Sequence, residues 1–220
     1  MKKITIACAL LAVLLAGCGE RNASQEQIAG NSPSASAAPE EELAPMPDGG
    51  LDPVMEKLKE RANELAKKQD MAILWYGAGA GEMIEMNVRS YGDIEHKLTD
   101  KELDAFMISL FEWNGEPFPI KMTVSECCGD ELGPLGVVTE IDMERNRILV
   151  VSATEKNGNT EDPAAVWIGL TDDAKVYVDG KPAPREFDES LIGKEARAWT
   201  TGIVEQSYPS QVTGIKVMIG

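Results

Sequence analysis

Basic residues, histidines and aromatic residues are scarce in this 220-residue chain. It has 21 Lys and Arg against 37 Asp and Glu, and the net charge of −16 argues against a nucleic-acid partner, since phosphate binding needs clustered basic residues. A single His excludes the usual metal sites built from several histidines. Aromatic residues make up only 5% of the chain, but 43% of it is hydrophobic, which is sufficient for one ordinary domain or two small ones.

The first 18 residues predict export and lipid attachment. Lys2 and Lys3 precede an apolar stretch over 4–15, which is too short to span a bilayer. The stretch ends in Leu-Ala-Gly-Cys, which resembles the lipobox of bacterial lipoproteins. The resemblance implies that the signal peptide, residues 1–17, is removed and that Cys18 is lipidated. Acyl chains such as palmitate then anchor the protein on the extracytoplasmic face of the cell membrane. An ordinary secretory signal with an incidental Cys is the alternative.

Residues 18–50 are expected to form the lipidated Cys and a disordered tether. The segment is rich in Ser, Ala, Pro and Glu and has almost no large apolar side chains. Such a composition cannot offset the entropy of ordering by burial. The tether would lift the globular part away from the lipid surface.

A small α/β unit is expected over 51–133. Asp52 and Pro53 predict the N-cap and first residue of a helix whose apolar residues recur at helical spacing. Thr99 and Glu102 form a capping box at the start of a second helix. The expected elements are a helix over about 53–69, a buried strand over 71–76, a strand or helical turn over 82–88, a helix from 99 to about 114 and a strand over 118–124.

The region 134–220 follows a Gly-Pro junction and reads as a succession of short strands. Strands are expected over 136–141, 147–151, 165–168, 175–178, 194–206 and 214–219. About six strands in some 85 residues predict a small antiparallel β-barrel with an OB-like rhythm. The predicted fold class is therefore α+β, a small α/β unit followed by this barrel.

Two parts of the globular region resemble families of unknown function. The Gly-Val-Val opening at 136, the Ile-Leu-Val-Val strand and the Glu-x-Ser-Tyr-Pro-x-Gln segment at 205–211 resemble domain-of-unknown-function family 3221 over 135–220. That family consists of small secreted or lipid-anchored proteins of Gram-positive bacteria, so the resemblance implies a compact barrel, an extracytoplasmic location and no assigned activity. The Tyr-Gly-Asp-Ile segment at 91–94, with the helix and strand that follow it, more faintly resembles domain-of-unknown-function family 4362.

Tyr208 is the candidate for a structural or binding role in the barrel. Pro209 forces Tyr208 into an extended conformation at a strand end, and we expect its ring to fill the barrel. In the alternative interpretation, Tyr208 forms an aromatic–amide ligand contact together with Trp199 or Gln211.

Cys127 and Cys128 form a second candidate site. Cys8 leaves with the signal peptide and Cys18 carries lipid, so these two thiols have only each other as partners. A bond between adjacent residues would be strained and easily reduced. Two thiolates alone do not complete a tetrahedral metal site, so neither a metal nor a cofactor is expected. The favoured interpretation is a non-catalytic pair near the junction of the two units.

Catalytic motifs are not expected in this chain. The Gly-rich run 77–81 follows a strand, but Glu82 stands where a dinucleotide-binding loop needs Gly, so a hairpin or flexible connection is expected. His96 lies between charged residues and has no identifiable partner for nucleophilic catalysis. We expect a lipid-anchored binding or accessory module of the cell envelope, not an enzyme, that engages a small ligand or another envelope protein. A thiol-based redox or soft-metal-handling lipoprotein is the alternative.

Overall fold

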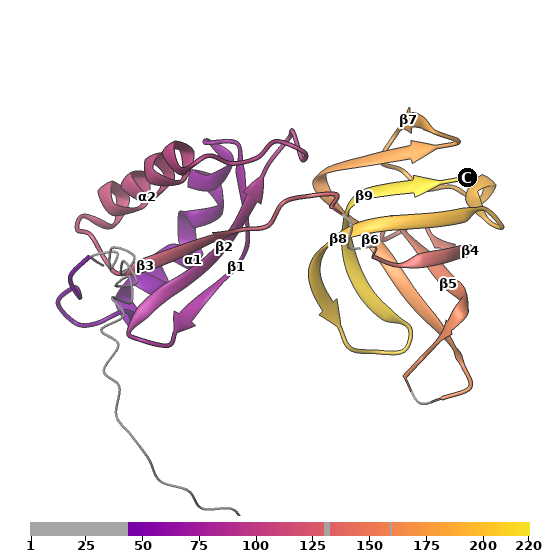
Figure 1. Cartoon of the computed structure of the whole chain (residues 1–220), viewed down its shortest axis with the longest axis horizontal. Helices are drawn as coiled ribbons and strands as arrows, with labels where there is room; N and C mark the ends of the chain where they lie inside the picture. Colours follow the sequence, from indigo (N-terminus) through magenta and orange to yellow (C-terminus); the bar gives the residue numbers. More distant parts are fainter. Residues whose placement is uncertain (1–43, 130–132, 159) are drawn as a thin grey trace, which may run out of the picture. The chain divides into compact units, whose positions relative to one another are not determined.

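The structure is a computed structural model that describes residues 44–129, 133–158 and 160–220 (Figure 1). The predicted signal peptide, Cys18 and the tether as far as residue 43 lie outside the described residues. Residues Glu42–Gly220 belong to one compact unit of the chain. No helix in the described ranges is long and apolar enough to cross a membrane.

The first part of this unit is a three-stranded sheet with two helices (Figure 1). Its elements are α1 (Asp52–Lys67), β1 (Met71–Gly79), β2 (Met83–Ser90), α2 (Asp100–Asn114) and β3 (Ile120–Val124). The strand order is β1-β2-β3, with β1 antiparallel and β3 parallel to β2. The hairpin between β1 and β2 confirms the predicted hairpin, although the first residues of the Gly-rich run extend β1.

Both helices pack on the same face of this sheet. Ile84, Met86 and Val88 alternate along β2, so their side chains share one face, and all three are buried in a core with Phe106 and Leu110 of α2. Four α1 residues at helical spacing complete the same core: Val54, Leu58, Ala62 and Ala66. The opposite face of β2 carries Glu85, Asn87 and Arg89 and is not covered by the two helices.

Two predictions about helix α1 and strand β1 were wrong in detail. Leu51 is the N-cap residue of α1 and Asp52 lies inside the helix, so the helix begins one residue earlier than predicted. The capping box of Thr99 and Glu102 is confirmed at α2, where the Thr99 hydroxyl accepts the Glu102 N–H. Strand β1 is not buried throughout, because it is an edge strand with one uncovered side, and Trp75 is 45% exposed.

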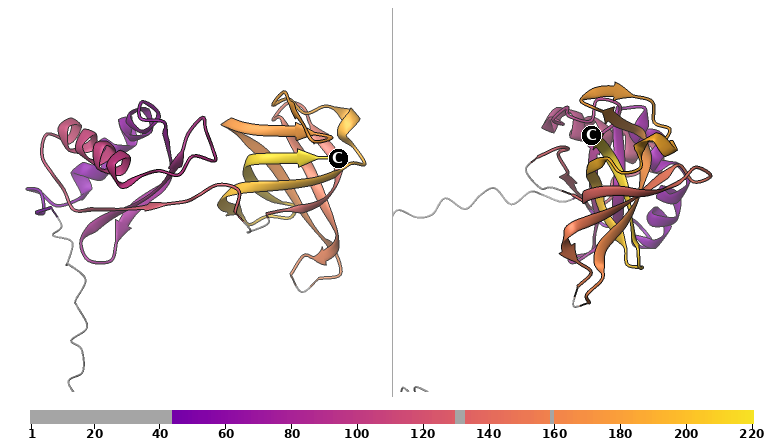
Figure 2. Two further views of the ribbon diagram at one scale, coloured as in Figure 1. Left: turned by 45° about the horizontal axis from the view of Figure 1, so that its top comes forward. Right: turned by 90° about the vertical axis from the view of Figure 1, so that its right-hand side faces the viewer.

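The second part is a five-stranded closed barrel. Its elements are β4 (Leu135–Asp142), β5 (Arg147–Lys156), β6 (Pro163–Val178), β7 (Lys181–Ala183), η1 (Glu189–Leu191), β8 (Glu195–Glu205) and β9 (Ser210–Ile219). The strands follow the order β5-β4-β8-β9-β6, and pairing of β5 with β6 closes the barrel, while β7 is paired only to β6 (Figure 2). This order supports the predicted small barrel within an α+β fold. The barrel is mixed rather than antiparallel, because β6 and β9 run parallel.

Strand β6 replaces the two separate strands that the sequence predicts over 165–168 and 175–178. Its register against β9 jumps between Leu170 and Lys175, where five residue steps on β6 oppose only two on β9. The resulting bulge contains Asp172 and Asp173, the acidic pair that interrupts the apolar pattern. A bulge bends its strand outward and re-aims side chains, so a single strand accommodates this polar segment.

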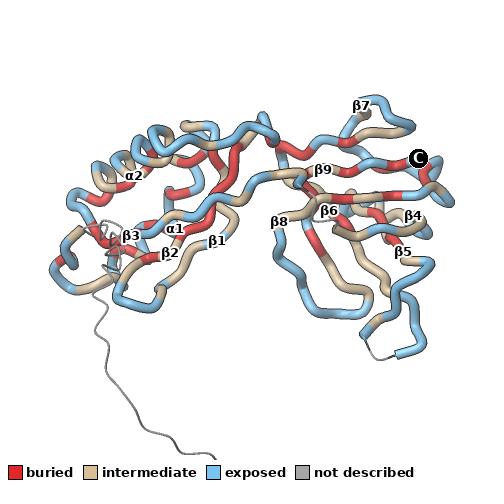
Figure 3. Tube along the Cα trace, in the orientation of Figure 1, coloured by how far each residue is buried: buried red, intermediate tan, exposed pale blue. Residues whose placement is uncertain are grey.

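The barrel core is mostly aliphatic, with Phe187 as a buried aromatic residue, and Tyr208 is not part of it. Val138, Ile148, Ile168 and Val217 are buried in this core, together with other residues along the barrel strands (Figure 3). Tyr208 is 52% exposed in the β8–β9 loop, and its hydroxyl donates to the Pro163 carbonyl oxygen at 3.2 Å. The prediction that its ring fills the barrel is therefore wrong. Small strand residues, aliphatic side chains and Phe187 fill the interior without it.

Candidate ligand-binding site

Arg147, at the first position of β5, is held in place from three sides. Its Nε donates to Asp142 Oδ2 at 2.9 Å, and its Nη1 donates to Gln211 Oε1 at 2.8 Å. The guanidinium carbon lies 4.5 Å from the centroid of the Trp167 ring, within the range of a cation–π contact. A guanidinium fixed in this way loses little side-chain entropy when it binds a further group.

The barrel's pairing explains why these residues meet. Trp167 and Gln211 are direct register partners on the parallel strands β6 and β9, so their side chains lie on the same face. Arg147 begins β5, the strand on the other side of β6, and Asp142 ends β4. The Arg145 backbone N–H and the Arg147 guanidinium hold the pKa of Asp142 below its usual value, so this carboxylate is ionised at neutral pH.

These residues border a cavity of about 560 Å³. Arg147, Trp167 and Gln211 line one side of it, together with Glu205 from the end of β8 and Thr213 from β9. On the other side, Ala72, Ile73 and Leu74 of the edge strand β1 and Arg89 of β2 line the cavity. The lining therefore combines an indole face, a fixed guanidinium, a carboxamide, a carboxylate and hydroxyl groups.

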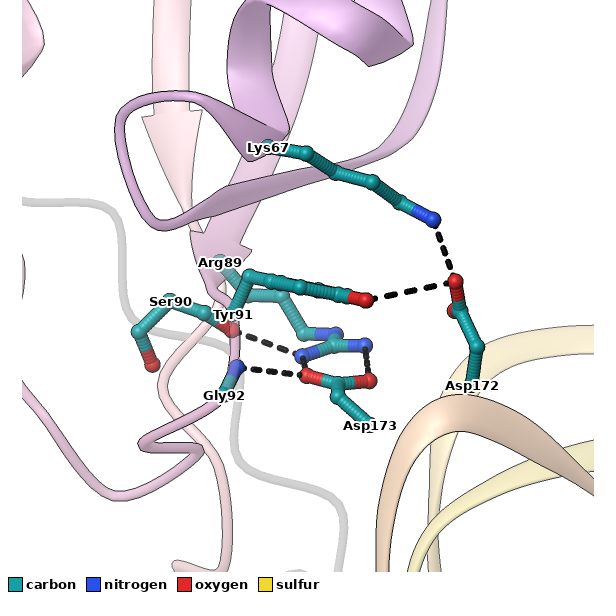
Figure 4. Close-up of polar contacts among 7 residues, drawn as sticks. All are labelled: Lys67, Arg89, Ser90, Tyr91, Gly92, Asp172 and Asp173. Carbon is teal, nitrogen blue, oxygen red and sulfur yellow. Dashed lines mark hydrogen bonds and ion pairs between the residues drawn. The ribbon is translucent and has the colours of Figure 1, made fainter.

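A buried ion pair lies at the wall of this cavity (Figure 4). Arg89 Nη1 and Nη2 each lie 2.7 Å from one carboxylate oxygen of Asp173, and both side chains are only 3% exposed. The Gly92 N–H donates to the same carboxylate at 3.0 Å, and Arg89 Nη1 also donates to the Ser90 carbonyl oxygen at 2.6 Å. The outward bulge of β6 thus brings Asp173 into contact with the polar face of β2.

Neighbouring Asp172 makes a second, exposed contact in the same region. Its carboxylate pairs with Lys67 and accepts the Tyr91 hydroxyl at 3.3 Å, as Figure 4 shows. Hydrogen bonding from Lys67 is the main cause of its lowered pKa. A third contact joins Lys216 of β9 to the exposed Glu95 at 2.6 Å. Among the described residues, three ion pairs thus join the barrel to the end of α1, to β2 and to the segment after β2, and of these Arg89–Asp173 is the buried one.

Burial alone would raise the pKa of Asp173, because it removes the carboxylate from water. Hydrogen bonds from Arg89 and from the Gly92 N–H outweigh this effect and lower the pKa to about 2. Asp173 is therefore charged over the whole physiological range and supplies a counter-charge to Arg89.

The structure separates the residues of the alternative interpretation, in which Tyr208 forms a ligand contact with Trp199 or Gln211. Gln211 lines the cavity beside Arg147 and Trp167. Trp199 borders a second cavity, of about 350 Å³, where its Nε1 donates to the Gly129 carbonyl oxygen at 3.1 Å. Tyr208 lies in the exposed β8–β9 loop. Gln211 thus remains the single member of that set at the first cavity.

Cys127 and Cys128 are joined to each other by a disulfide bond and line the second cavity. His96 Nε2 lies 3.0 Å from Glu102 Oε1, and within the described ranges no hydrogen bond joins His96 to either cysteine. Across the described ranges, no group of three or more His, Cys, Asp or Glu is arranged to hold a metal ion.

Four residues of the site had no clear signal in the sequence: Arg89, Arg147, Trp167 and Asp173. Arg89 occupies a polar position of an alternating strand, a pattern that predicts exposure to solvent. Arg147 and Trp167 each stand within ordinary strand sequences, and their partnership depends on register across the closed barrel. Asp173 lies between the two strands that the sequence predicts over 165–168 and 175–178, so the sequence places it in a loop rather than in a bulge of one strand.

Comparison with protein-family models finds no match for this sequence, and comparisons with curated proteins and with solved structures likewise find no significant match. The two family resemblances drawn from the sequence therefore stay predictions.

Proposed function

We propose that this protein is a lipid-anchored binding module of the bacterial cell envelope, and that the cavity beside Arg147 holds an uncharged glycan. The anchor rests on the lipobox-like segment that ends at Cys18. The binding role rests on one observation above all: Arg147 is fixed on the Trp167 ring between Asp142 and Gln211, at the border of a cavity.

The position of the cavity on the barrel supports binding. Counted along the chain, β4, β5, β6, β8 and β9 give the pairing order one-two-three-five-four, and the third and fifth strands are parallel. In five-stranded barrels of the OB type, the face of strands two and three, with the loop between strands four and five, binds oligosaccharides or oligonucleotides. Arg147 and Trp167 lie on the equivalent strands, and Glu205 and Gln211 flank the equivalent loop.

The charge of the chain favours a glycan over a polyanion. A net charge of −16 repels nucleic acids and other polyanionic chains over the distances at which they approach. Within the cavity, Arg147 is already balanced by Asp142 and Arg89 by Asp173, while Glu205 adds a negative charge. An uncharged ligand avoids the cost of placing a further charge among these pairs.

The hydrogen-bonding groups suit hydroxyl- and amide-bearing molecules. Arg147 supplies N–H donors, Glu205 supplies acceptors, and the Gln211 carboxamide supplies both kinds of group. The Trp167 indole adds a flat apolar surface of the kind on which a ring packs. A volume of about 560 Å³ falls within the range of small-molecule sites, which is about 300–1,000 Å³. The proposed role is binding without catalytic turnover.

Saturation-transfer NMR on the full chain in detergent micelles tests this function. The probes are three uncharged trisaccharides: cellotriose, maltotriose and the trimer of N-acetylglucosamine. We expect transfer to the ring protons of at least one probe from the wild type and from Arg185→Ala, which removes an exposed side chain outside the cavity. Transfer should be lost in Gln211→Ala. Absence of transfer from the wild type to all three probes, or equal transfer from both variants, would contradict the proposal.

A further inference from the structure

The Cys127–Cys128 disulfide lies in the segment that follows β3 and lines the second cavity, which shares Leu74 and Thr201 with the proposed glycan site. A disulfide stabilises a fold mainly by closing a loop of chain, and its contribution decreases as the loop shortens. These two residues are adjacent in the sequence, so their bond closes no loop of chain. Stability of the fold therefore does not explain the pairing.

The two sulfur-bearing residues are accessible from a cavity. Both are half-buried, and both line the second cavity together with Ser125, Gly129 and Trp199. A thiol that enters this cavity meets the disulfide directly. Access of this kind is a requirement for thiol–disulfide exchange, since the attacking thiolate must reach one of the two sulfur atoms.

Hydrogen bonds hold the disulfide segment at both ends. At one end, the Ser125 N–H donates to the Val88 carbonyl oxygen at 2.8 Å, and its hydroxyl donates to Asn87 Oδ1 at 2.9 Å. At the other end, the Trp199 indole of β8 donates to the Gly129 carbonyl oxygen. Between these points, Cys128 has φ of +68°, a conformation that residues other than Gly rarely adopt.

We propose that Cys127 and Cys128 form a thiol–disulfide exchange site, whose oxidised state keeps residues 125–129 docked on β8. The reductant is a dithiol, either a small molecule or a protein. Its first thiolate attacks one Sγ, forms a mixed disulfide and releases the other cysteine as a thiolate. The reductant's second thiolate then attacks the reductant's own sulfur in the mixed disulfide. This step closes the reductant's disulfide and releases the remaining cysteine as a thiolate. Two electrons pass to the cysteine pair, and the reductant's two protons end on the Cys127 and Cys128 thiols.

Reduction has a structural consequence at the second cavity. Once the bond is open, the Cys128 backbone is free to leave the left-handed region for the conformations that its side chain prefers. That rotation moves the Gly129 carbonyl group away from the Trp199 indole. The exchange site is chemically independent of the glycan site, so either proposal survives failure of the other.

Thiol counting tests the exchange step. The full chain with Cys8→Ser and Cys18→Ser keeps only Cys127 and Cys128, since the sequence has four cysteines. Under native conditions, we expect no maleimide adducts before treatment with dithiothreitol and two adducts afterwards, read by intact mass. Two adducts before treatment would show that no disulfide is formed. Adducts that require both dithiothreitol and a denaturant would show that a thiol cannot reach the bond. Either result overturns the proposal.

Hydrogen exchange on the same protein tests the docking consequence. The amide hydrogens of 125–129 should exchange about five- to tenfold faster after reduction, because docking contacts worth about one hydrogen bond are lost. Trp199→Phe removes the indole donor, so its oxidised form should already exchange faster and respond less to reduction. Equal exchange in the oxidised and reduced wild type would contradict a role for the disulfide in docking.

Discussion

Arg89 on β2 and Asp173 in the β6 bulge form a buried, bidentate ion pair although they stand 84 residues apart in the chain. The pair connects the polar face of the three-stranded sheet to the barrel at the wall of the candidate cavity. Both charges are buried, and each would be left without a counter-charge if the two side chains moved apart. The pair therefore fixes the position of β2 relative to β6 at this wall.

Removal of one partner of this pair should destabilise the protein strongly. Asp173→Ala leaves the Arg89 guanidinium buried without its counter-charge, and we expect a loss of about 3–5 kcal/mol in the free energy of unfolding. Asp172→Ala is the matched control at the adjacent position. Its carboxylate is exposed, so its loss should cost about 1 kcal/mol or less. Urea unfolding of the full chain measures both values, and equal losses would show that Arg89–Asp173 is not buried in solution.

Asp173 should also make the free energy of unfolding depend on pH in the acidic range. Its folded-state pKa of about 2 lies below the value of about 3.9 in an unfolded chain. A lowered pKa contributes stability that is fully present above about pH 4 and is lost as the pH falls toward 2. Glu102, whose pKa of about 2 is set mainly by hydrogen bonding to Thr99, titrates in the same range. The comparison is therefore between the wild type and Asp173→Asn, whose stability should fall less steeply below pH 4. Identical slopes would contradict the assignment.

Tyr208→Ala should change stability little. The ring is half exposed and makes one hydrogen bond to a carbonyl oxygen, so we expect a cost of about 1 kcal/mol or less. Phe187→Ala is the aromatic control inside the barrel core and should cost about 3–5 kcal/mol. Thermal or urea unfolding measures both. A large cost for Tyr208→Ala would show that the ring is buried after all.

Lipidation should depend on Cys18. Cys18→Ser removes the thiol at the expected cleavage site, so the variant should accumulate as a precursor without a diacylglyceryl group. Cys8→Ser is the control, because Cys8 lies within the expected signal peptide. Mass spectrometry and partition into detergent measure the outcome. If Cys18→Ser is cleaved at the same site and partitions into detergent as the wild type does, the result would argue for an ordinary secretory signal.

The sequence predicts those parts of the fold that depend on local patterns. The capping box of Thr99 and Glu102 and the helical spacing after Pro53 are local signals, and both helices were predicted within a few residues. The barrel was predicted from the rhythm of its strands. Its parallel pair and the bulge at Asp173 depend on long-range pairing, which local patterns do not encode.

The candidate site shows the same limit. Gln211 entered the alternative interpretation of the sequence as a possible partner of Tyr208, which does not line this cavity. Its actual neighbours, Arg147 and Trp167, reach it through the register of three strands in a closed barrel. The sequence does not indicate these neighbours, because Arg147, Trp167 and Gln211 lie on three different strands and meet only through strand pairing.

The most direct measurement is the affinity of Arg147→Ala for the trisaccharide that gives the strongest saturation transfer. Isothermal titration should show binding to the wild type and at least about tenfold weaker binding to Arg147→Ala, since hydrogen bonds from a charged group are worth about 1.5–3 kcal/mol. Arg185→Ala, which removes an exposed arginine outside the cavity, should bind as the wild type does. Unfolding midpoints of both variants control for loss of structure. Equal affinity of the two variants, with both folded, would contradict a binding site built around Arg147.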